Sequence, residues 1–334
     1  MVFGRQLQIG IWLLAAAAGL LLSVFFAVSY GAKELTLSAV WSAVWHYDPS
    51  LTSHQIVHDL RLPRVLGAAV IGMAFGTAGA MMQGVTRNPM ADTGILGINA
   101  GSAAVVALSF AFIPGVSYLQ LMLLSFAGAA LATLLILLLG SATPGGLTSM
   151  KLTIAGAVIA AMLHSFSTGV AIYFDLSQDL AFWYAGGVSG ITWAHLQLIT
   201  PVIVLAMIGA ILLGRPITFL SLGDESAINL GIRVRYIKVI ALMLVVILAG
   251  VSVSAAGSIS FVGLVVPHMA RRLIGVDYRA VIPLSALLGA ILLVWADLAS
   301  RIVQPPREFA IGAMVAMVGV PFFLYLARRE GREL

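Results

Sequence analysis

Three arginines lie where long apolar runs of this sequence begin or end, and their side chains could bind an acidic partner. Arg61 and Arg64 precede a glycine-rich apolar run, and Arg301 follows another apolar run. A guanidinium keeps its charge and matches a carboxylate in fork geometry. Two interpretations are open: the arginines receive the carboxylates of a soluble partner, or they anchor helix ends at the headgroups of a membrane.

A second group of charges lies between two uncharged stretches. The segment from Arg215 to Lys238 contains two acids and four bases, whereas residues 180–214 and 239–270 contain no Asp, Glu, Lys or Arg. Because charges inside a bilayer are costly, this segment must lie in water or at a headgroup surface.

The local chemistry of residues 215–238 predicts one short helix. Ser221 and Asp224 have the spacing of a capping box, and Gly231 is a typical helix stop. The apolar side of such a helix would consist of Ala227, Ile228 and Leu230. It could be a docking surface for a partner, and the competing interpretation is a solvated loop with a helical turn.

Few ionisable residues lie inside the predicted membrane spans. His164, His268 and Asp297 are the candidates for a proton or ion relay. Asp297 and Arg301 have helical i,i+4 spacing, which favours a structural ion pair. His164 is better interpreted as a contact between helices than as a ligand. This scarcity of buried charge argues against transport driven by ions moving through the chain.

Sequence motifs for an internal energy source or a metal site are lacking. The sequence contains no Gly-x-x-x-x-Gly-Lys-Ser/Thr phosphate loop, no His-Glu-x-x-His pair and no cysteine. Any ATP-driven work must therefore be done by a partner protein.

The composition sets the fold class that positions these residues. Of the 334 residues 61% are hydrophobic and 9% are charged, whereas soluble domains contain about 25% charged residues. We therefore expect an all-α, polytopic membrane protein that forms a single domain over residues 1–334.

A membrane span needs about 20 apolar residues, and the apolar runs predict about ten spans. The predicted spans are 9–29, 65–86, 94–113, 118–140, 152–173, 195–213, 239–256, a short or interrupted eighth helix within 257–272, 281–299 and 309–327. Two wet segments, 31–61 and 174–187, separate spans. Gly72 and Gly76 have the small-xxx-small spacing that lets two helices approach closely.

The distribution of bases predicts the orientation. With ten spans and a cytoplasmic N-terminus, 13 of the 18 Lys and Arg lie inside, and only Lys33, Arg61, Arg64, Arg301 and Arg307 lie outside. This bias follows the positive-inside rule. Both termini and the 215–238 segment are then cytoplasmic.

Several motifs, in order along the chain, match one family. They are Arg61-Leu62-Pro63-Arg64; Gly79-Ala80-Met81-Met82-Gln83 with Asn88-Pro89-Met90-Ala91 and Gly94-Ile95-Leu96-Gly97; Ser221-Leu222-Gly223-Asp224-Glu225 with Leu230-Gly231; residues 257–268; Ala296-Asp297 with Arg301; and Gly319-Val320-Pro321-Phe322-Phe323. In these motifs, and over nearly its whole length, the chain resembles the FecCD-type permeases of type II ABC importers, which take up ferric siderophores, haem and vitamin B12.

The resemblance implies a bacterial cell-membrane protein with defined partners. These are cytoplasmic ABC ATPase subunits that hold ATP and Mg, an outer substrate-binding (lipo)protein, a second permease subunit that is a copy or a paralogue, and membrane lipid. It places the ATPase-coupling surface at Ser221, Gly223, Asp224, Glu225, Ala227, Leu230 and Gly231. It makes Arg61, Arg64 and Arg301 the seats for glutamates of the binding protein. The chain itself is then expected to be no enzyme, to bind no metal, cofactor or nucleic acid, and to have no catalytic residues.

An iron(III)-siderophore is the cargo that the resemblance favours. Residues 177–180 and 182–184 resemble siderophore permeases of Gram-positive bacteria most closely. The alternatives are vitamin B12 or haem carried by the same machinery, and an ion-coupled secondary carrier that would use His164 or Asp297. One departure concerns the family's Pro-x-Glu-Leu-Pro-x-Gly motif, in which Ala310 replaces the second proline. This substitution leaves the geometry before the last helix open.

Overall fold

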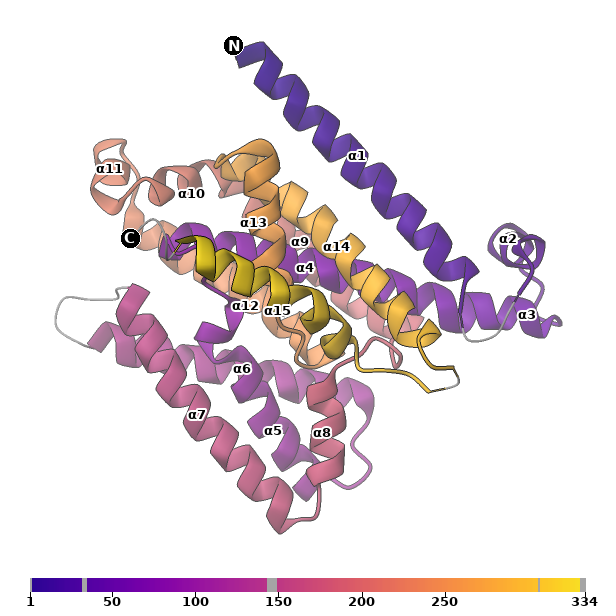
Figure 1. Cartoon of the computed structure of the whole chain (residues 1–334). Coiled ribbons are helices and arrows are strands. Elements are labelled where there is room, and N and C mark those ends of the chain that lie inside the picture. The colour runs from indigo at the N-terminus through magenta and orange to yellow at the C-terminus, as the bar shows by residue number, and fades with distance from the viewer. Residues whose placement is uncertain (1, 32–34, 143–148, 306, 331–334) are drawn as a thin grey trace.

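The computed structural model describes residues 2–31, 35–142, 149–305 and 307–330, and every regular element in these ranges is helical (Figure 1). The helices are α1 (Val2–Ser29), α2 (Leu37–Trp45), α3 (Thr52–Gln55), the π-helix η1 (Ile56–Arg61), α4 (Leu62–Thr86), the 3₁₀-helix η2 (Thr93–Leu96), α5 (Ile98–Phe112), α6 (Tyr118–Ala142), α7 (Ser149–Tyr173), α8 (Ser177–Ala185), α9 (Trp193–Leu212), α10 (Gly214–Ser221), α11 (Asp224–Asn229), α12 (Val234–Ala256), α13 (Val262–Ile274), α14 (Tyr278–Ile302) and α15 (Ile311–Glu330). The predicted all-α class is confirmed.

Seven helices of the described part are long and apolar enough to cross a membrane, and two shorter apolar helices, at Ile98–Phe112 and Ile311–Tyr325, accompany them. All nine correspond to predicted spans. The predicted eighth helix corresponds to α13, which has only 13 residues. The total of ten crossings and the cytoplasmic placement of both termini stay predictions.

Helix α4 forms the centre of the bundle, and its glycines determine how closely α14 approaches. The backbone of Gly72 lies against the carbonyl oxygen of Gly289, and the backbone of Gly76 lies against that of Ser285, so that a Cβ at either glycine would collide with an oxygen. Small residues allow such close packing between membrane helices. The predicted small-xxx-small contact is therefore present, and it joins α4 to α14.

Of the two predicted forms of the eighth helix, short or interrupted, the structure has the short one, and a non-helical segment precedes it. Gly257 ends α12, residues 257–260 are not helical, and α13 begins at Val262. The side chain of Gln83 on α4 donates to the carbonyl oxygens of Gly263 at 3.1 Å and Leu264 at 3.2 Å. Pro267 has no N–H to offer the carbonyl oxygen of Gly263 one turn earlier in α13, and Gln83 supplies a donor there instead.

The structure places more helix in the predicted wet segments than the sequence analysis assigned. Residues 174–187 contain the two-turn helix α8, and residues 31–61 contain α2, α3 and η1. Helix α12 begins at Val234, five residues before the predicted start of the seventh span. Lys238 therefore lies in the second turn of a helix instead of in a loop.

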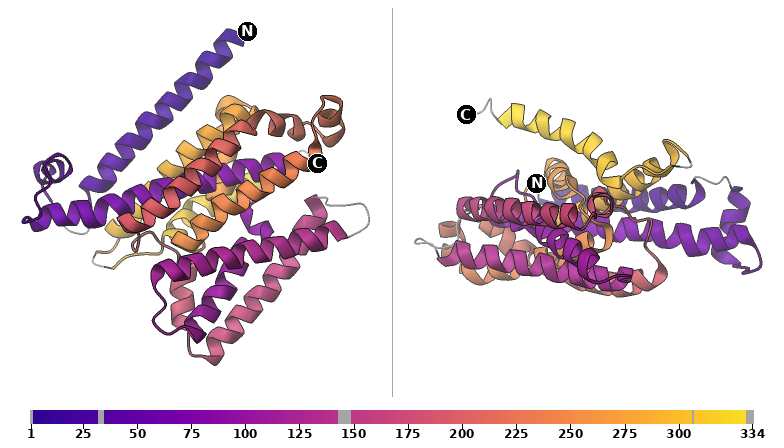
Figure 2. Two further views of the ribbon diagram at one scale, coloured as in Figure 1. Left: turned by 180° about the vertical axis from the view of Figure 1, so that it is seen from behind. Right: turned by 90° about the horizontal axis from the view of Figure 1, so that it is seen from below.

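The short charged helices lie at one end of the bundle. In Figures 1 and 2, α10 and α11 lie at the end where α15 finishes, and α2 and α3 lie at the opposite end. The end that carries α10 and α11 is called the inner end below, following the predicted orientation, and the other end is called the outer end.

Candidate functional site

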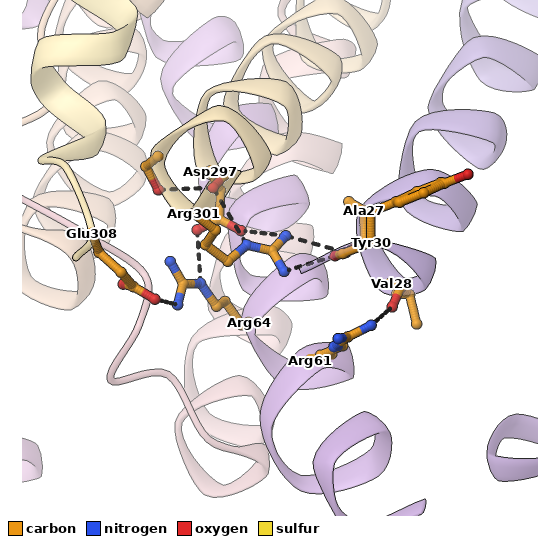
Figure 3. Close-up of polar contacts among 9 residues, drawn as sticks. Ala27, Val28, Tyr30, Arg61, Arg64, Asp297, Arg301 and Glu308 are labelled. Carbon is orange, nitrogen blue, oxygen red and sulfur yellow. Dashed lines mark hydrogen bonds and ion pairs between the residues drawn. The ribbon is translucent and has the colours of Figure 1, made fainter. Parts of the chain in front are cut away.

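Arg64 and Arg301 belong to one ionic cluster at the outer end, and Arg61 lies near it (Figure 3). Arg64 lies in the first turn of α4 and contacts two carboxylates. Its Nε lies 2.8 Å from Oδ1 of Asp297, and its Nη1 lies 2.7 Å from Oε1 of Glu308. Arg301, one turn after Asp297 on α14, places Nη2 3.0 Å from Oδ2 of Asp297. The predicted i,i+4 pair is confirmed, and Asp297 is shared between two arginines.

Arg61 and Arg301 also bind the C-terminal end of α1. Arg61 donates to the carbonyl oxygens of Val28 and Ser29, both at 2.9 Å. Arg301 donates to those of Ala27 at 3.1 Å and Tyr30 at 3.3 Å. The last carbonyl groups of a helix have no hydrogen-bond donor within the helix, and they lie at the negative end of the helix dipole. The two guanidinium groups supply both the missing donors and a compensating positive charge. These contacts fix α1 to the body of the protein.

The members of this cluster differ in how far a partner protein could reach them. Arg61 and Arg301 are buried, and the side chain of Asp297 is 0% exposed. The side chain of Arg64 is 12% exposed and that of Glu308 is 41% exposed. Of the three predicted seats, Arg64 is thus the most accessible in this state, and Arg61 and Arg301 are occupied by α1.

The inner end differs from the sequence-based prediction of one capped helix. Two short helices are present, and Gly223, with φ 126°, separates them. Ser221 does not cap the second helix; its hydroxyl donates to the carbonyl oxygen of Thr218 at 2.7 Å and lies in the last turn of α10. The capping prediction fails because a hydroxyl at a helix C-terminus can bond back to its own helix, which competes with the capping geometry.

Asp224 connects α11 to its neighbours. Its Oδ2 lies 2.7 Å from Nζ of Lys238 on α12 and 3.8 Å from Nη2 of Arg87, which follows α4. A carboxylate in the first turn of a helix also suits the positive end of the helix dipole. Neither partner was predicted, because Arg87 is distant in sequence and Lys238 was assigned to a loop.

The apolar residues of this segment divide into two sets. Ala227 is buried, whereas Leu222, Ile228 and Leu230 are 64%, 60% and 56% exposed. Glu225 is exposed beside them, and Gly231, with φ +79°, ends the segment by donating to the carbonyl oxygen of Ile228 at 2.8 Å. We call Leu222, Glu225, Ile228 and Leu230 the inner surface. Its exposed leucines and isoleucine, rimmed by charge, have the composition of a protein contact.

A cavity of about 580 Å³ opens beside Arg64. Glu308, Phe309 and Ala310 line part of it, and residues 182–183, 185–190 and 254–257 line other parts. Its walls are mostly glycine, small and aromatic side chains, with Arg64 and Glu308 as the charged members.

The remaining ionisable candidates make structural contacts. Nδ1 of His164 on α7 lies 3.1 Å from the hydroxyl of Tyr184 on α8, as expected for a contact between helices. The ring of His268 packs edge-on against Phe322, with centroids 5.7 Å apart. Within the described residues, no group of three or more His, Cys, Asp or Glu is placed to hold a metal ion.

Comparisons with known proteins agree with this architecture. The model of the FecCD transport family matches residues 19–329. The iron(3+)-hydroxamate import system permease protein FhuB of Bacillus subtilis (strain 168) is 48% identical over 322 residues, covering 96% of this chain and 84% of the relative. The iron-uptake system permease protein FeuB of the same organism is 42% identical, covering 96% of each chain.

A solved structure shows the same fold. It is described as an inward-facing conformation of a metal-chelate type ABC transporter, and it superposes with a TM-score of 0.84 at 24% identity, covering 95% of this chain and 98% of that chain. The match over residues 19–329 and the identity to two full-length permeases decide the classification. This chain is a multi-pass protein of the bacterial cell membrane and belongs to the FecCD transport family.

Proposed function

We propose that this chain is the membrane-spanning permease subunit of an ATP-driven importer that moves an iron(III)-siderophore delivered by an outer binding protein. The observation that carries the proposal is the 48% identity, over 96% of the chain, to a permease named for iron(3+)-hydroxamate import. We further propose that the two ends of the molecule contact the partners that such an importer requires.

The inner surface is the proposed contact with the ATPase subunits. Leu222, Ile228 and Leu230 project from a segment that bonds to α12 and Arg87 through Asp224. Movement of an ATPase that holds these side chains would be transmitted through Asp224 and Lys238 into α12. Of the residues that the resemblance named, Glu225 and Leu230 are exposed, which supports their proposed contact with the partner. Ala227 is buried and, with Gly223 and Gly231, shapes the turns around α11; Ser221 ends α10.

The outer cluster is the proposed seat of the binding protein. Arg64, at the edge of the cluster, would meet an acidic side chain first, and Arg61 and Arg301 would follow only if α1 or the acid moves. Translocation itself would proceed along small and neutral side chains, because a lining that held the chelate tightly would retain it. ATP and Mg would be bound by the ATPase subunits and not by this chain.

The experiment that tests the assembly is purification of this chain from its native membrane in mild detergent, followed by mass spectrometry. We expect an ABC ATPase subunit to co-purify, and the number of related permease chains in the sample distinguishes a copy from a paralogue. Purification of the chain alone, with transport that survives ATP depletion and stops when the proton gradient is collapsed, would favour an ion-coupled carrier instead.

The cargo is tested by uptake of radioactive iron supplied as a ferric trihydroxamate chelate. Cells that lack the chain should regain ATP-dependent uptake when it is supplied in trans, and competition with unlabelled haem or vitamin B12 should leave that uptake unchanged. Competition by either compound would redirect the proposal to the corresponding cargo.

A charge reversal tests the inner surface. Glu225→Arg should abolish co-purification of the ATPase and uptake together, because it reverses a charge within the proposed contact, and a mismatched charge at an interface opposes binding. Asp179→Arg is the matched control, because Asp179 is an exposed acid on α8, far from the inner surface. Equal behaviour of the two variants would refute the assignment.

A further inference from the structure

Arg64 is held by two carboxylates that differ greatly in accessibility. Asp297 is 0% exposed and belongs to the same buried cluster as Arg301, whereas the side chain of Glu308 is 41% exposed at the surface. The two contacts also use different nitrogens, Nε for Asp297 and Nη1 for Glu308. A carboxylate that arrives from outside can therefore take the place of Glu308 at Nη1 without disturbing Asp297.

Glu308 belongs to a short non-helical segment, residues 307–310, between α14 and α15. One backbone bond connects this segment to α14, because Phe309 donates to the carbonyl oxygen of Ser300 at 3.1 Å. Arg307 donates to the carbonyl oxygen of Gln304, which lies just after α14, at 2.9 Å. The ion pair between Glu308 and Arg64 links this segment to α4, and both residues line the cavity.

The same segment forms part of the wall of the outer cavity. Glu308, Phe309 and Ala310 line this cavity together with Arg64, and α15 begins directly after them at Ile311. The ion pair therefore closes one side of the cavity by connecting two of its walls. Release of Glu308 would free residues 307–310 from α4 and widen the entrance.

We propose that Glu308 is an internal stand-in for the binding protein: it occupies Arg64 in the resting permease, and an acidic side chain of the docking protein displaces it and so releases segment 307–310 at the cavity entrance. The proposal rests on the function proposed above. It couples docking to opening, because a carboxylate that takes both terminal nitrogens of Arg64 in fork geometry competes with Glu308 for Nη1.

The departure at Ala310 suits this role. Proline restricts its own φ and that of the preceding residue, so a proline here would hold the segment in one conformation. Ala310 lacks this restriction, and its carbonyl oxygen accepts from Ala313 at 3.1 Å, which starts α15. The segment can thus move while the first turn of α15 stays bonded.

The first test is the affinity of the permease for its binding protein. The assembled importer is placed in lipid nanodiscs, and the Kd for its own binding protein, purified without a lipid anchor, is measured for the wild type, Glu308→Gln and Asp179→Asn. Glutamine keeps the shape of Glu308 and removes the charge that competes for Arg64. A partly exposed ion pair is worth up to about 1 kcal/mol, which corresponds to a Kd about two- to fivefold lower in Glu308→Gln.

Asp179→Asn is the matched control, because it also removes one exposed negative charge, from α8 beside the same cavity, without contact to Arg64. A gain confined to Glu308→Gln supports the proposal. No change in either variant, or an equal gain in both, overturns it, since an equal gain reflects only net charge. If the wild type does not bind the protein at all, the proposed function fails, and the proposal fails with it.

The second test measures the segment itself. The chain contains no cysteine, so Arg307→Cys carries a single spin label beside Glu308. When Glu308 is unchanged, addition of the binding protein should increase the mobility of the label. In Glu308→Gln the label should be mobile before any addition. The release of the segment is refuted if the binding protein leaves the label mobility unchanged in the protein with Glu308 and if Glu308→Gln does not raise that mobility. This holds even if the affinity changes.

Discussion

Neutralising Asp297 should destabilise the protein more than any other single loss of charge at the outer end. Its carboxylate is fully buried and contacts Arg64 at 2.8 Å and Arg301 at 3.0 Å. Each contact is worth roughly 4 kcal/mol of attraction in a partly polar protein environment, most of which offsets the cost of burying the charges. In Asp297→Asn the buried guanidinium of Arg301 loses its counter-ion. Breaking one partner of a buried pair costs about 3–5 kcal/mol, which is the expected loss.

The assay is reversible unfolding of the purified chain in mixed micelles with increasing SDS, followed by helical circular dichroism. Glu308→Gln is the internal comparison, because it removes a carboxylate from the same Arg64 at a 41% exposed position and should cost less than about 1 kcal/mol. If the two variants lose the same free energy of unfolding, burial does not determine the strength of these ion pairs. A loss below about 1 kcal/mol for Asp297→Asn would refute the reasoning.

Further consequences concern packing and the inner end. Gly76→Ala should cost about 1–3 kcal/mol or more in the same unfolding assay, because its Cβ would meet a carbonyl oxygen of α14, whereas Gly169→Ala, with open space around it, should be neutral. Ile228→Glu should leave unfolding unchanged and reduce ATPase co-purification, because this side chain is 60% exposed; an undiminished yield would exclude it from the contact. Asp224→Asn should lower stability by at most about 1 kcal/mol, because its pair with Lys238 is partly exposed, and should weaken the coupling of ATP hydrolysis to uptake more than it weakens assembly.

The sequence predicted those features that depend on neighbouring residues. The apolar runs located the spans, the spacing of Asp297 and Arg301 predicted their ion pair, and the glycines at 72 and 76 predicted a close helix contact. Periodicity cannot tell which helix makes that contact. It also gave no sign that Arg64 meets a carboxylate 233 residues away, since only the folded bundle brings α4 and α14 together.

The errors at the inner end have a similar cause. Ser221 and Asp224 have capping-box spacing, but the hydroxyl bonds to Thr218 and the carboxylate bonds to Lys238. A capping bond forms only if the side chain has no better hydrogen-bond partner nearby, and here both side chains bond to other groups. The exposure of the apolar residues also differs from the prediction. Ala227, Ile228 and Leu230 were expected on one side of a helix, but the fold buries Ala227 and exposes Ile228 and Leu230.

Under the proposed function, the two ends of this chain use different interactions for their contacts with partners. At the outer end the arginines are already satisfied by Asp297, Glu308 and the carbonyls of α1, so an incoming acid must exchange with a group of the chain itself. Exchange between charges is nearly balanced in free energy and therefore reversible, and salt weakens it. At the inner end the exposed apolar side chains of α11 gain free energy whenever they are covered. This asymmetry suits the proposed function, because a binding protein that docks and leaves needs a reversible contact, whereas an ATPase that stays bound needs a favourable one.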